Sequence, residues 1–499
     1  MKKIILFITT ASMLLITGCV NDSEAFNDEH KKPYEAPPQA YVNYAEVKLA
    51  SQMASPLRSA NICRYFQHYY AATTYYEESR FNFSGGGMPE THWDALYKNV
   101  LGNLEAAKKA VDNEVKPVTV SPGDWTIRQT NKLAIIDLLQ VYTFQILVDT
   151  YGNVPYFEAL NPDLVLPKYD DAYTIYKDLL SRVDEDLKML DTSQKDGFFG
   201  EYLLEGKVEK WKLFANSLKL KIGINLTDVD PALAKLTIEE AYKGGVVLKS
   251  SDNIAFKFVT TAPHYNSIYA AIVGSGRNDY VVEKTIVDKL KALDDPRKDV
   301  YFQNKIGGVE IGGVLVGGEY VGGVLGIGND YPSCSHVGKA LIQKETPHYL
   351  FDSSEINFYL AEAAEKGYSV GNTSEYYYET AIKGSFEQWN IPAAQVTTYL
   401  AHPDVKYPTT GSKQEKINKI AEQVWIAMFN RGFESWTTWR RLDYPVLTAP
   451  NAVTAAEGKV PVRVTYPVPE QTLNGANWTE AVAAIGGDKL STKLFWDKN

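Results

Sequence analysis

Three stretches of the chain combine aromatic side chains with polar residues, a mixture that suits ligand contact. They hold Tyr75, Tyr76, Phe81, Asn82 and Phe83, then Tyr265, Asn266, Tyr269, Arg277, Asn278 and Tyr280, and finally Tyr320 and Tyr331. Aromatic rings pack against the apolar C–H faces of sugars, and polar groups around them bind the hydroxyls. A peptide would use the same rings, with Arg277 binding a carboxylate. The competing interpretation is that each ring packs beneath its own loop.

The spacings that mark common catalytic sites are absent from the sequence. It has no His-Glu-x-x-His, no Gly-x-Ser-x-Gly, no Walker A motif and no Gly-x-Gly-x-x-Gly opening a helix after a strand. Its seven histidines are spread singly. We therefore predict no catalytic residues, no metal site and no cofactor. Two alternatives stay open: structural calcium among the Asp-rich turns, although no EF-hand-like run is present, and an all-helical surface glycoside hydrolase or lyase.

The composition is that of a globular protein. Of 499 residues, 45% are apolar and 22% are charged, which excludes a disordered or collagen-like chain. The net charge of −10 argues against nucleic-acid binding, which needs a basic surface. The 33 tyrosines outnumber the 19 phenylalanines, so much of the aromatic surface carries a polar tip.

The N-terminus is typical of an exported protein. Lys2 and Lys3 precede an apolar run from Ile4 to Ile16 that is too short to span a bilayer. The segment ends Ile16-Thr17-Gly18-Cys19, which resembles the lipobox of bacterial lipoproteins. That resemblance implies removal of residues 1–18 as a signal peptide, lipidation of Cys19 and attachment to a membrane by acyl chains. The alternative is an ordinary secretory signal with a chance cysteine.

An acidic and then Pro-rich stretch follows the cysteine. We predict that residues 19–42 form a tether between the lipid and the folded body. The scattered acidic residues weakly resemble the surface-export signal of Bacteroidetes lipoproteins. Cys63 and Cys334 remain, and we favour two buried, unpaired thiols over a disulfide.

Helical periodicity dominates the body and predicts a mostly α protein. Apolar residues recur at spacings of three and four over 173–190, 211–222 and 417–428. The stretch 133–148 is apolar on most sides and predicts a central buried helix. Asp352 and Glu355 resemble a capping box, and Gly367 suits the end of that helix.

Strand signals are sparse and local. Residues 254–260 and 462–466 alternate in polarity and predict short hairpins in long connections. In 306–328, Gly-Gly pairs recur every five residues, a period that matches neither helix nor strand. We favour an irregular surface excursion there. The alternative is a loop whose backbone lies close to a ligand or partner.

An ordered set of motifs resembles the SusD/RagB family of nutrient-binding outer-membrane lipoproteins and covers nearly the whole chain. The motifs are Trp93-x3-Tyr97 leading to Asn103, Asp149 to Tyr156, Lys210 to Leu220, Asp294-Asp295-Pro296-Arg297, Tyr359 to Ala363 with Gly367, Glu434-x-Trp436-x3-Arg440-Arg441 followed by Pro445, and Pro461 through Arg463, Tyr466, Pro467 and Glu470 to Asn474. Leu442-Asp443-Tyr444 departs from the small residues often found after the arginine pair. We interpret most motif residues as structural, with Trp211 in the core and with Arg297 and Arg440 holding carboxylates or carbonyls.

The resemblance implies a single SusD-like domain over 43–499. Degenerate tetratricopeptide-like helix pairs would form a scaffold over 43–253 and 340–440, with long loops and a few short β-hairpins. Residues 254–339 would form a loop-rich ligand or partner face, and 441–499 an irregular C-terminal segment.

The resemblance also implies a function without catalysis. The protein would sit in the outer membrane by its lipid anchor, facing outward, and capture an extracellular oligosaccharide. It would act as the lid of a SusC-like TonB-dependent transporter. The same scaffold binding peptides for import is the alternative.

Overall fold

The computed structural model describes residues 36–57, 60–83, 87–194, 197–311, 314–449 and 451–498. Residues 38–499 form one compact unit. The first helix of that unit, α2, begins at Pro38, inside the segment 19–42 that the sequence predicted as tether. The predicted signal peptide, 1–18, and the predicted lipidation site, Cys19, lie outside the described residues.

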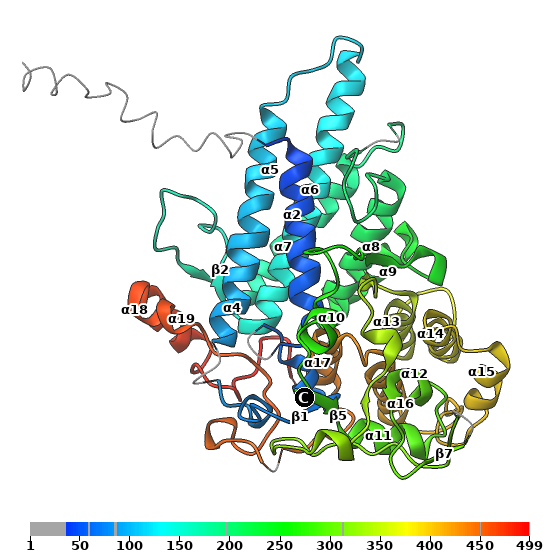
Figure 1. Cartoon of the computed structure of the whole chain (residues 1–499). Coiled ribbons are helices and arrows are strands. Elements are labelled where there is room, and N and C mark those ends of the chain that lie inside the picture. Colours follow the sequence, from blue (N-terminus) through cyan, green and yellow to red (C-terminus); the bar gives the residue numbers. More distant parts are fainter. Residues whose placement is uncertain are drawn as a thin grey trace, which may run out of the picture. The chain divides into compact units, whose positions relative to one another are not determined.

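The fold is mostly helical, as predicted (Figure 1). The helices are α2 (Pro38–Ala54), α3 (Cys63–Phe66), α4 (Met88–Asp94), the π-helix η2 (Ala95–Leu101), α5 (Gly102–Asp112), α6 (Pro122–Tyr151), α7 (Ala172–Met189), α8 (Val208–Asn225), α9 (Pro231–Gly244), α10 (Ser267–Tyr269), the π-helix η4 (Ala270–Gly274), α11 (Lys284–Ala292), α12 (Lys298–Tyr301), α13 (Ser353–Glu365), α14 (Ser374–Gln388), α15 (Ala393–Leu400), α16 (Lys413–Ala427), α17 (Gly432–Leu442), α18 (Val468–Leu473) and α19 (Gly475–Ala484). The last two lie in the segment predicted to be irregular.

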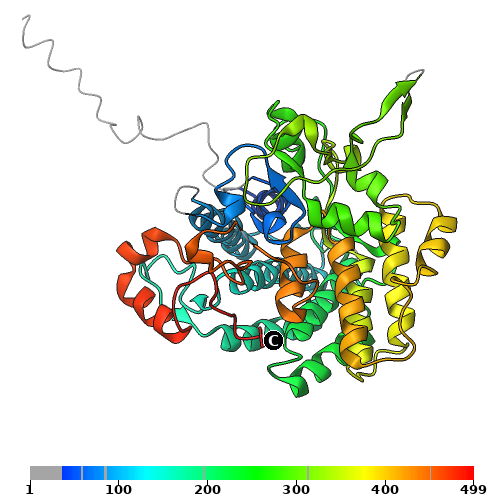
Figure 2. The same cartoon turned by 90° about the horizontal axis from the view of Figure 1, so that it is seen from below.

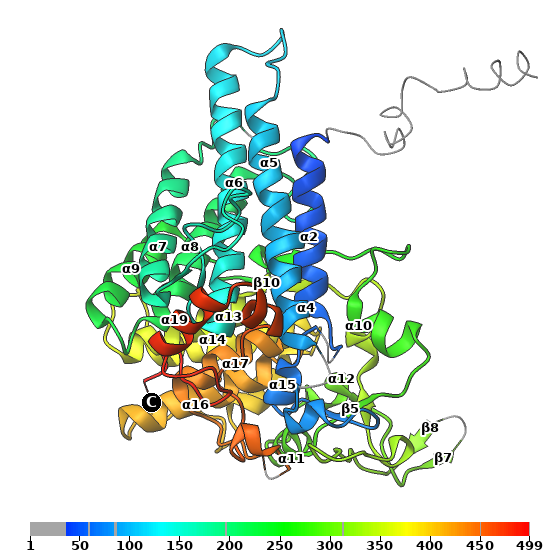
Figure 3. The ribbon, with the colours of Figure 1, turned by 90° about the vertical axis from the view of Figure 1, so that its left-hand side faces the viewer.

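Sequential helices pack in pairs, and the pairs pack side by side. Helix α2 contacts α5, α5 contacts α6, α6 contacts α7, and α8 contacts α9, while α13 contacts both α14 and α16. Figures 1 and 3 show α2, α5 and α6 running alongside one another, with α13, α14, α16 and α17 gathered below them. This arrangement agrees with the predicted helix pairs.

Helix α6 is the predicted central helix. It begins where the Ser121 hydroxyl accepts a hydrogen bond from the Asp124 amide at 3.1 Å, and Pro122 fits its first position. It ends at Gly152, whose φ of 86° favours glycine. From Ala134 onward nearly every side chain is buried. Length and composition would allow α6 to cross a membrane, but its burial inside the protein is that of a core helix.

The start of α13 corrects one prediction. The Asp352 carboxylate caps the helix by accepting the Glu355 amide at 2.8 Å, as expected. The Glu355 carboxylate does not complete a capping box. It binds Arg431 at 2.7 Å and Tyr359 at 2.8 Å instead, because burial requires a charged partner for it.

Short antiparallel strand pairs join distant segments. They are β1 (Tyr70–Ala72) with β5 (Tyr280–Val282), β2 (Val154–Pro155) with β3 (Tyr169–Asp170), β4 (Ile254–Phe256) with β10 (His348–Phe351), β6 (Phe302–Gln303) with β9 (His336–Val337), and β7 (Val309–Ile311) with β8 (Val314–Val316).

Neither sequence-predicted hairpin forms, although the first segment does contain a strand. Within 254–260, only Ile254–Phe256 is a strand, and it pairs with the distant β10. Residues 462–466 form no strand, because their amides bond elsewhere: Val462 donates to Leu490 at 3.0 Å and Val464 to Thr150 at 3.1 Å.

The glycine-rich segment contains a hairpin where we expected an irregular excursion. Strands β7 and β8 pair in register, and Figures 2 and 3 show the hairpin projecting from the domain. After the hairpin, the backbone at Gly322 and Gly323 packs closely against the backbone of Lys284. A Cβ on Gly322 would lie 2.4 Å from the Lys284 Cα, and Lys284 donates to the Gly323 carbonyl at 2.8 Å. At Gly322, glycine therefore allows close approach to the chain itself.

The arginines of the sequence motifs lie inside the fold, as predicted. The fully buried Arg297 guanidinium binds the Asp295 carboxylate through Nε and Nη2 at 3.0 and 2.7 Å. Arg440 donates to the carbonyls of Asp149 and Val462 at 2.6 and 3.1 Å. Cys63 and Cys334 are buried and unpaired, which confirms that prediction.

Candidate functional site

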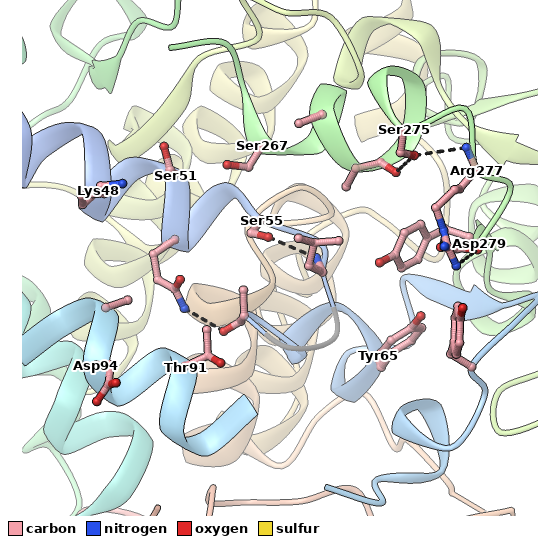
Figure 4. A pocket seen from close by; sticks show the side chains of 18 of the residues that line it. Lys48, Ser51, Ser55, Tyr65, Thr91, Asp94, Ser267, Ser275, Arg277 and Asp279 are labelled. Atoms are coloured by element: carbon pink, nitrogen blue, oxygen red, sulfur yellow. Dashed lines mark hydrogen bonds and ion pairs between the residues drawn. The ribbon is translucent and has the colours of Figure 1, made fainter. Parts of the chain in front are cut away.

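A cavity of about 840 Å³ lies between the end of α2, the α4–η2 helix and the α10–β5 loop (Figure 4). It is lined by Lys48, Ser51, Gln52, Ser55, Leu57, Ala60, Tyr65, Thr74, Tyr75, Thr91, Asp94, Ala95, Asn99, Ser267, Ala270, Ala271, Ser275, Arg277, Asp279 and Tyr280. Its volume is that of a small-molecule or oligomer site. We call it the α2 pocket.

One wall is a polar stripe on α2. Lys48 and Ser51 share a helix face, and Ser55, just beyond the end of α2, continues the same spacing with its amide donating to the Ser51 carbonyl at 3.1 Å. Gln52 beside them is fixed in place, because its amide donates to the Ala60 carbonyl at 2.8 Å and lies 2.9 Å from His92 Nδ1. These two contacts hold the Gln52 side chain in position on this wall.

The opposite wall is the segment before β5. The Arg277 guanidinium binds the Asp279 carboxylate through Nε at 2.6 Å and lies 5.0 Å from the centre of the Tyr75 ring. Asp279 also accepts the Thr74 hydroxyl at 2.6 Å. The hydrogen bond to Asp279 raises the pKa of Arg277 further above its usual value. The Tyr75 ring, 51% exposed, is thus backed by a cation on this wall.

The inner end of the pocket is aromatic. Tyr65 and Tyr280 are buried with ring centres 6.4 Å apart, and the Tyr70 ring lies 6.1 Å from that of Tyr280. Strand pairing of β1 with β5 places Tyr70 and Tyr280 on neighbouring strands. The pocket therefore joins ring surfaces to hydroxyl, amide and charged groups.

The described residues that line the pocket carry balanced charge. The cations Lys48 and Arg277 are matched there by the carboxylates of Asp94 and Asp279. His92, behind Gln52, is neutral at pH 7 because burial lowers its pKa to about 4. Among the described residues that line it, none is a histidine or cysteine. This arrangement suits binding of a neutral, hydroxyl-rich ligand.

Across the described residues, no group of three or more His, Cys, Asp and Glu side chains is placed to hold a metal ion. The structural calcium weighed from the sequence stays untested.

Three of the predicted contact residues meet in the α2 pocket: Tyr75, Arg277 and Tyr280. Tyr76 is exposed, and Asn278 is an exposed residue between Arg277 and Asp279. Tyr265 and Tyr269 form an edge-to-face pair 5.4 Å apart, with Lys344 Nζ 5.4 Å from the Tyr269 ring.

Other predicted contacts lie inside the fold, and we withdraw them as ligand contacts. Phe81 is 1% exposed and packs on Phe66. Asn266 is 1% exposed, caps α10 and donates to the Thr346 carbonyl at 2.6 Å. Tyr320 is buried against Phe302.

The remaining three face neighbouring side chains. Phe83 packs beside Phe66, and Asn82 donates to Glu77 at 3.2 Å. Tyr331 stacks on His336 with ring centres 3.7 Å apart.

The helical half of the pocket holds residues that were not predicted from the sequence. Lys48 and Ser51 on α2 and Thr91 and Asp94 on α4 face the cavity (Figure 4). The polar residues of α2 did not mark a site, since polar residues are expected on any exposed helix face. Thr91 and Asp94 likewise stand in no pattern that indicates a binding site.

Comparisons with known proteins identify relatives over most of the chain. A family of SusD-like proteins, described as starch-binding and associating with the outer membrane, matches residues 30–467. A comparison with curated proteins finds no match.

Solved structures share the fold. A chitin-binding protein is 24% identical with a TM-score of 0.79, covering 93% of this chain and 100% of its own. A chitin-binding SusD homolog from Flavobacterium johnsoniae is 22% identical with a TM-score of 0.75, covering 93% and 98%. A SusD homolog from Bacteroides uniformis is 24% identical with a TM-score of 0.76, covering 94% and 100%.

Proposed function

The chain belongs to the SusD-like family, and from this membership and the chemistry of the α2 pocket we propose that it captures extracellular glycan at the bacterial outer membrane. It is anchored through lipidated Cys19, faces outward and passes oligosaccharide to a SusC-like TonB-dependent transporter that it covers as a lid. It breaks no bond in the ligand.

The observation that carries the proposal is the composition of the α2 pocket. Rings of Tyr65, Tyr75 and Tyr280 line it together with serine and threonine hydroxyls, Asn99 and a balanced set of charges. Sugars offer C–H faces to such rings and hydroxyls to such polar groups. A site for a charged peptide terminus would be expected to carry excess charge, and this pocket has Asp279 already bound to Arg277.

Affinity gel electrophoresis tests ligand class. Wild-type protein is run through gels containing soluble starch, glycol chitin or no polymer, and a peptide panel is titrated by calorimetry. We expect retardation by at least one polymer without release of reducing sugar. Tight peptide binding with no retardation would favour the peptide alternative, and polymer cleavage would favour the enzyme.

Recovery from solubilised outer membrane tests the partner. We expect the lipoprotein to bring down a large barrel protein under gentle detergent conditions. Recovery of the lipoprotein alone would count against the transporter, and labelling with palmitate that persists in Cys19→Ala would count against the anchor.

A further inference from the structure

A second hollow, of about 860 Å³, lies at the loop between α7 and α8. It is lined by Phe199, Gly200, Glu201, Tyr202, Glu205, Lys207 and Glu209. The Phe199 side chain is 83% exposed and that of Tyr202 is 59% exposed. The neighbouring Phe198 is 1% exposed and packs in the core, so it is this ring that attaches the loop to the protein. Phe199 and Tyr202 do not contribute to that attachment, because they point into solvent.

The backbone of the loop is held in place from within. The buried Glu201 carboxylate accepts the amides of Leu204 at 2.7 Å and Gly206 at 2.8 Å. The Gly197 amide donates to the Gly206 carbonyl at 2.9 Å and closes the loop. Gly206 has a φ of 66°, and a Cβ there would lie 2.4 Å from the Phe198 carbonyl oxygen, so glycine is required for this closure.

The loop is also fastened to α2. Asn43 donates to the Gly200 carbonyl at 2.9 Å and accepts the Tyr202 amide at 3.1 Å. Glu46 accepts the same amide at 3.2 Å. These bonds fix the backbone on either side of Glu201, and with it the direction in which Phe199 and Tyr202 leave the loop.

Two exposed rings on a fixed backbone form a preorganised binding surface. Because these aromatic rings stay in water, they contribute little burial free energy to folding. A ligand that covers them would remove their apolar area from water, and it would not have to pay the entropy of ordering the loop. Glu205, Lys207 and Glu209 in the same hollow supply acceptors and donors beside the rings.

We propose that Phe199 and Tyr202 form a second glycan contact site, separate from the α2 pocket, that holds a polymer chain against the protein. The rings bind C–H faces of the sugar, and the side chains of Glu205, Lys207 and Glu209 bind its hydroxyls. This site rests on the proposed glycan function, and it adds to that function a preference for polymers over short oligosaccharides, since two contacts on one chain act together.

The test compares variants in the polymer gels described above. Phe199→Ala/Tyr202→Ala is expected to raise the apparent dissociation constant for the retarding polymer about fivefold or more, from the loss of two ring contacts. Calorimetry with a short oligosaccharide that binds the α2 pocket should be unchanged. Phe199→Tyr/Tyr202→Phe keeps both rings and should retain polymer binding.

Phe157→Ala and Tyr376→Ala serve as matched controls, because these exposed aromatics lie elsewhere on the protein, with 57% and 52% exposure. Retardation of the double alanine variant equal to wild type overturns the second site. So does a variant that binds polymer normally but no longer recovers the barrel protein, which would make the loop a protein interface. A wild-type protein that no polymer retards overturns the proposed function itself.

Discussion

Replacing Arg297 with leucine should destabilise the domain strongly while leaving the α2 pocket intact. Arg297 and Asp295 are both fully buried, and their bonded atoms lie 2.7 and 3.0 Å apart. Arg297→Leu leaves the Asp295 carboxylate buried without this cation, which costs about 3–5 kcal/mol. The Tyr399 hydroxyl and Gln423, which also bind Arg297, keep their hydrogen bond to each other at 3.0 Å. Most of the cost therefore comes from Asp295.

The loss of unfolding free energy in Arg297→Leu corresponds to a measurable fall in Tm. Unfolding entropy is roughly 2.1 cal/mol/K per residue, or about 1 kcal/mol/K over residues 38–499. A loss of about 4 kcal/mol thus lowers Tm by about 4 °C. Urea titration should show the same loss as a lower midpoint with an unchanged slope.

A double-variant cycle separates the buried charge from lost packing. Asp295→Asn/Arg297→Leu removes both charges, so we expect it to recover about half of the stability lost in Arg297→Leu. Polymer retardation by the folded variants should match wild type. An Arg297→Leu protein of wild-type stability, or one that is stable but no longer binds glycan, would refute the structural role assigned to this motif.

The remaining predictions concern a buried acid, a close backbone contact and a helix start. Asp186, beside the Asp137 carboxylate on which Arg182 and Lys108 converge, has its pKa raised to about 9 by burial and by Asp137. Between its unfolded value near 3.8 and pH 9 the folded state holds a proton that the unfolded state lacks, so this group makes stability fall as pH rises. The free energy of unfolding of Asp186→Asn should therefore rise relative to that of wild type by up to about 1.4 kcal/mol per pH unit across that window. Urea titrations that give the same difference between variant and wild type at pH 5 and at pH 8 would contradict the raised pKa of Asp186. Gly322→Ala forces a methyl group to within 2.4 Å of the Lys284 backbone and should cost about 1–3 kcal/mol in a thermal melt. Its control is Gly123→Ala in the first turn of α6, which has open space and should be neutral or slightly stabilising, so equal melting points for the two would argue against the close contact.

The helical scaffold could be predicted from sequence because its signal is local. The stripes over 173–190, 211–222 and 417–428 became α7, α8 and α16, since side chains three and four apart share one helix face. The burial of Arg297 and Arg440 was anticipated from the family motifs to which they belong, and their bonds to a carboxylate and to carbonyls satisfy the need of a buried charge for partners.

Strand pairing could not be predicted, because its partners are distant in sequence. The alternation over 254–260 marked the strand β4, but its partner β10 lies beyond α11 and α12 in the sequence. The amides of Val462 and Val464 bond to the carbonyls of Leu490 and Thr150, and no local sequence pattern reports such distant partners.

The loop residues of the α2 pocket could be predicted in part from the sequence, but its helical residues could not. Tyr75 and Arg277 stood out as loop residues with suitable chemistry, and they meet on one wall. Phe81 and Asn266 had equally suitable types but lie inside, because composition cannot tell which side of a loop faces solvent. Lys48 and Asp94 belong to helices, where polar residues are expected on any exposed face.

Titration calorimetry of wild type and Tyr75→Ala tests glycan binding in the α2 pocket most directly. The probes are maltoheptaose and chitohexaose, and Tyr376→Ala, an exposed tyrosine on α14, is the matched control. We predict saturable binding of at least one probe by wild type and the control, with Kd raised about threefold to tenfold in Tyr75→Ala by the loss of one ring contact. Binding by wild type that Tyr75→Ala leaves unchanged, or no binding of either probe, would contradict the account.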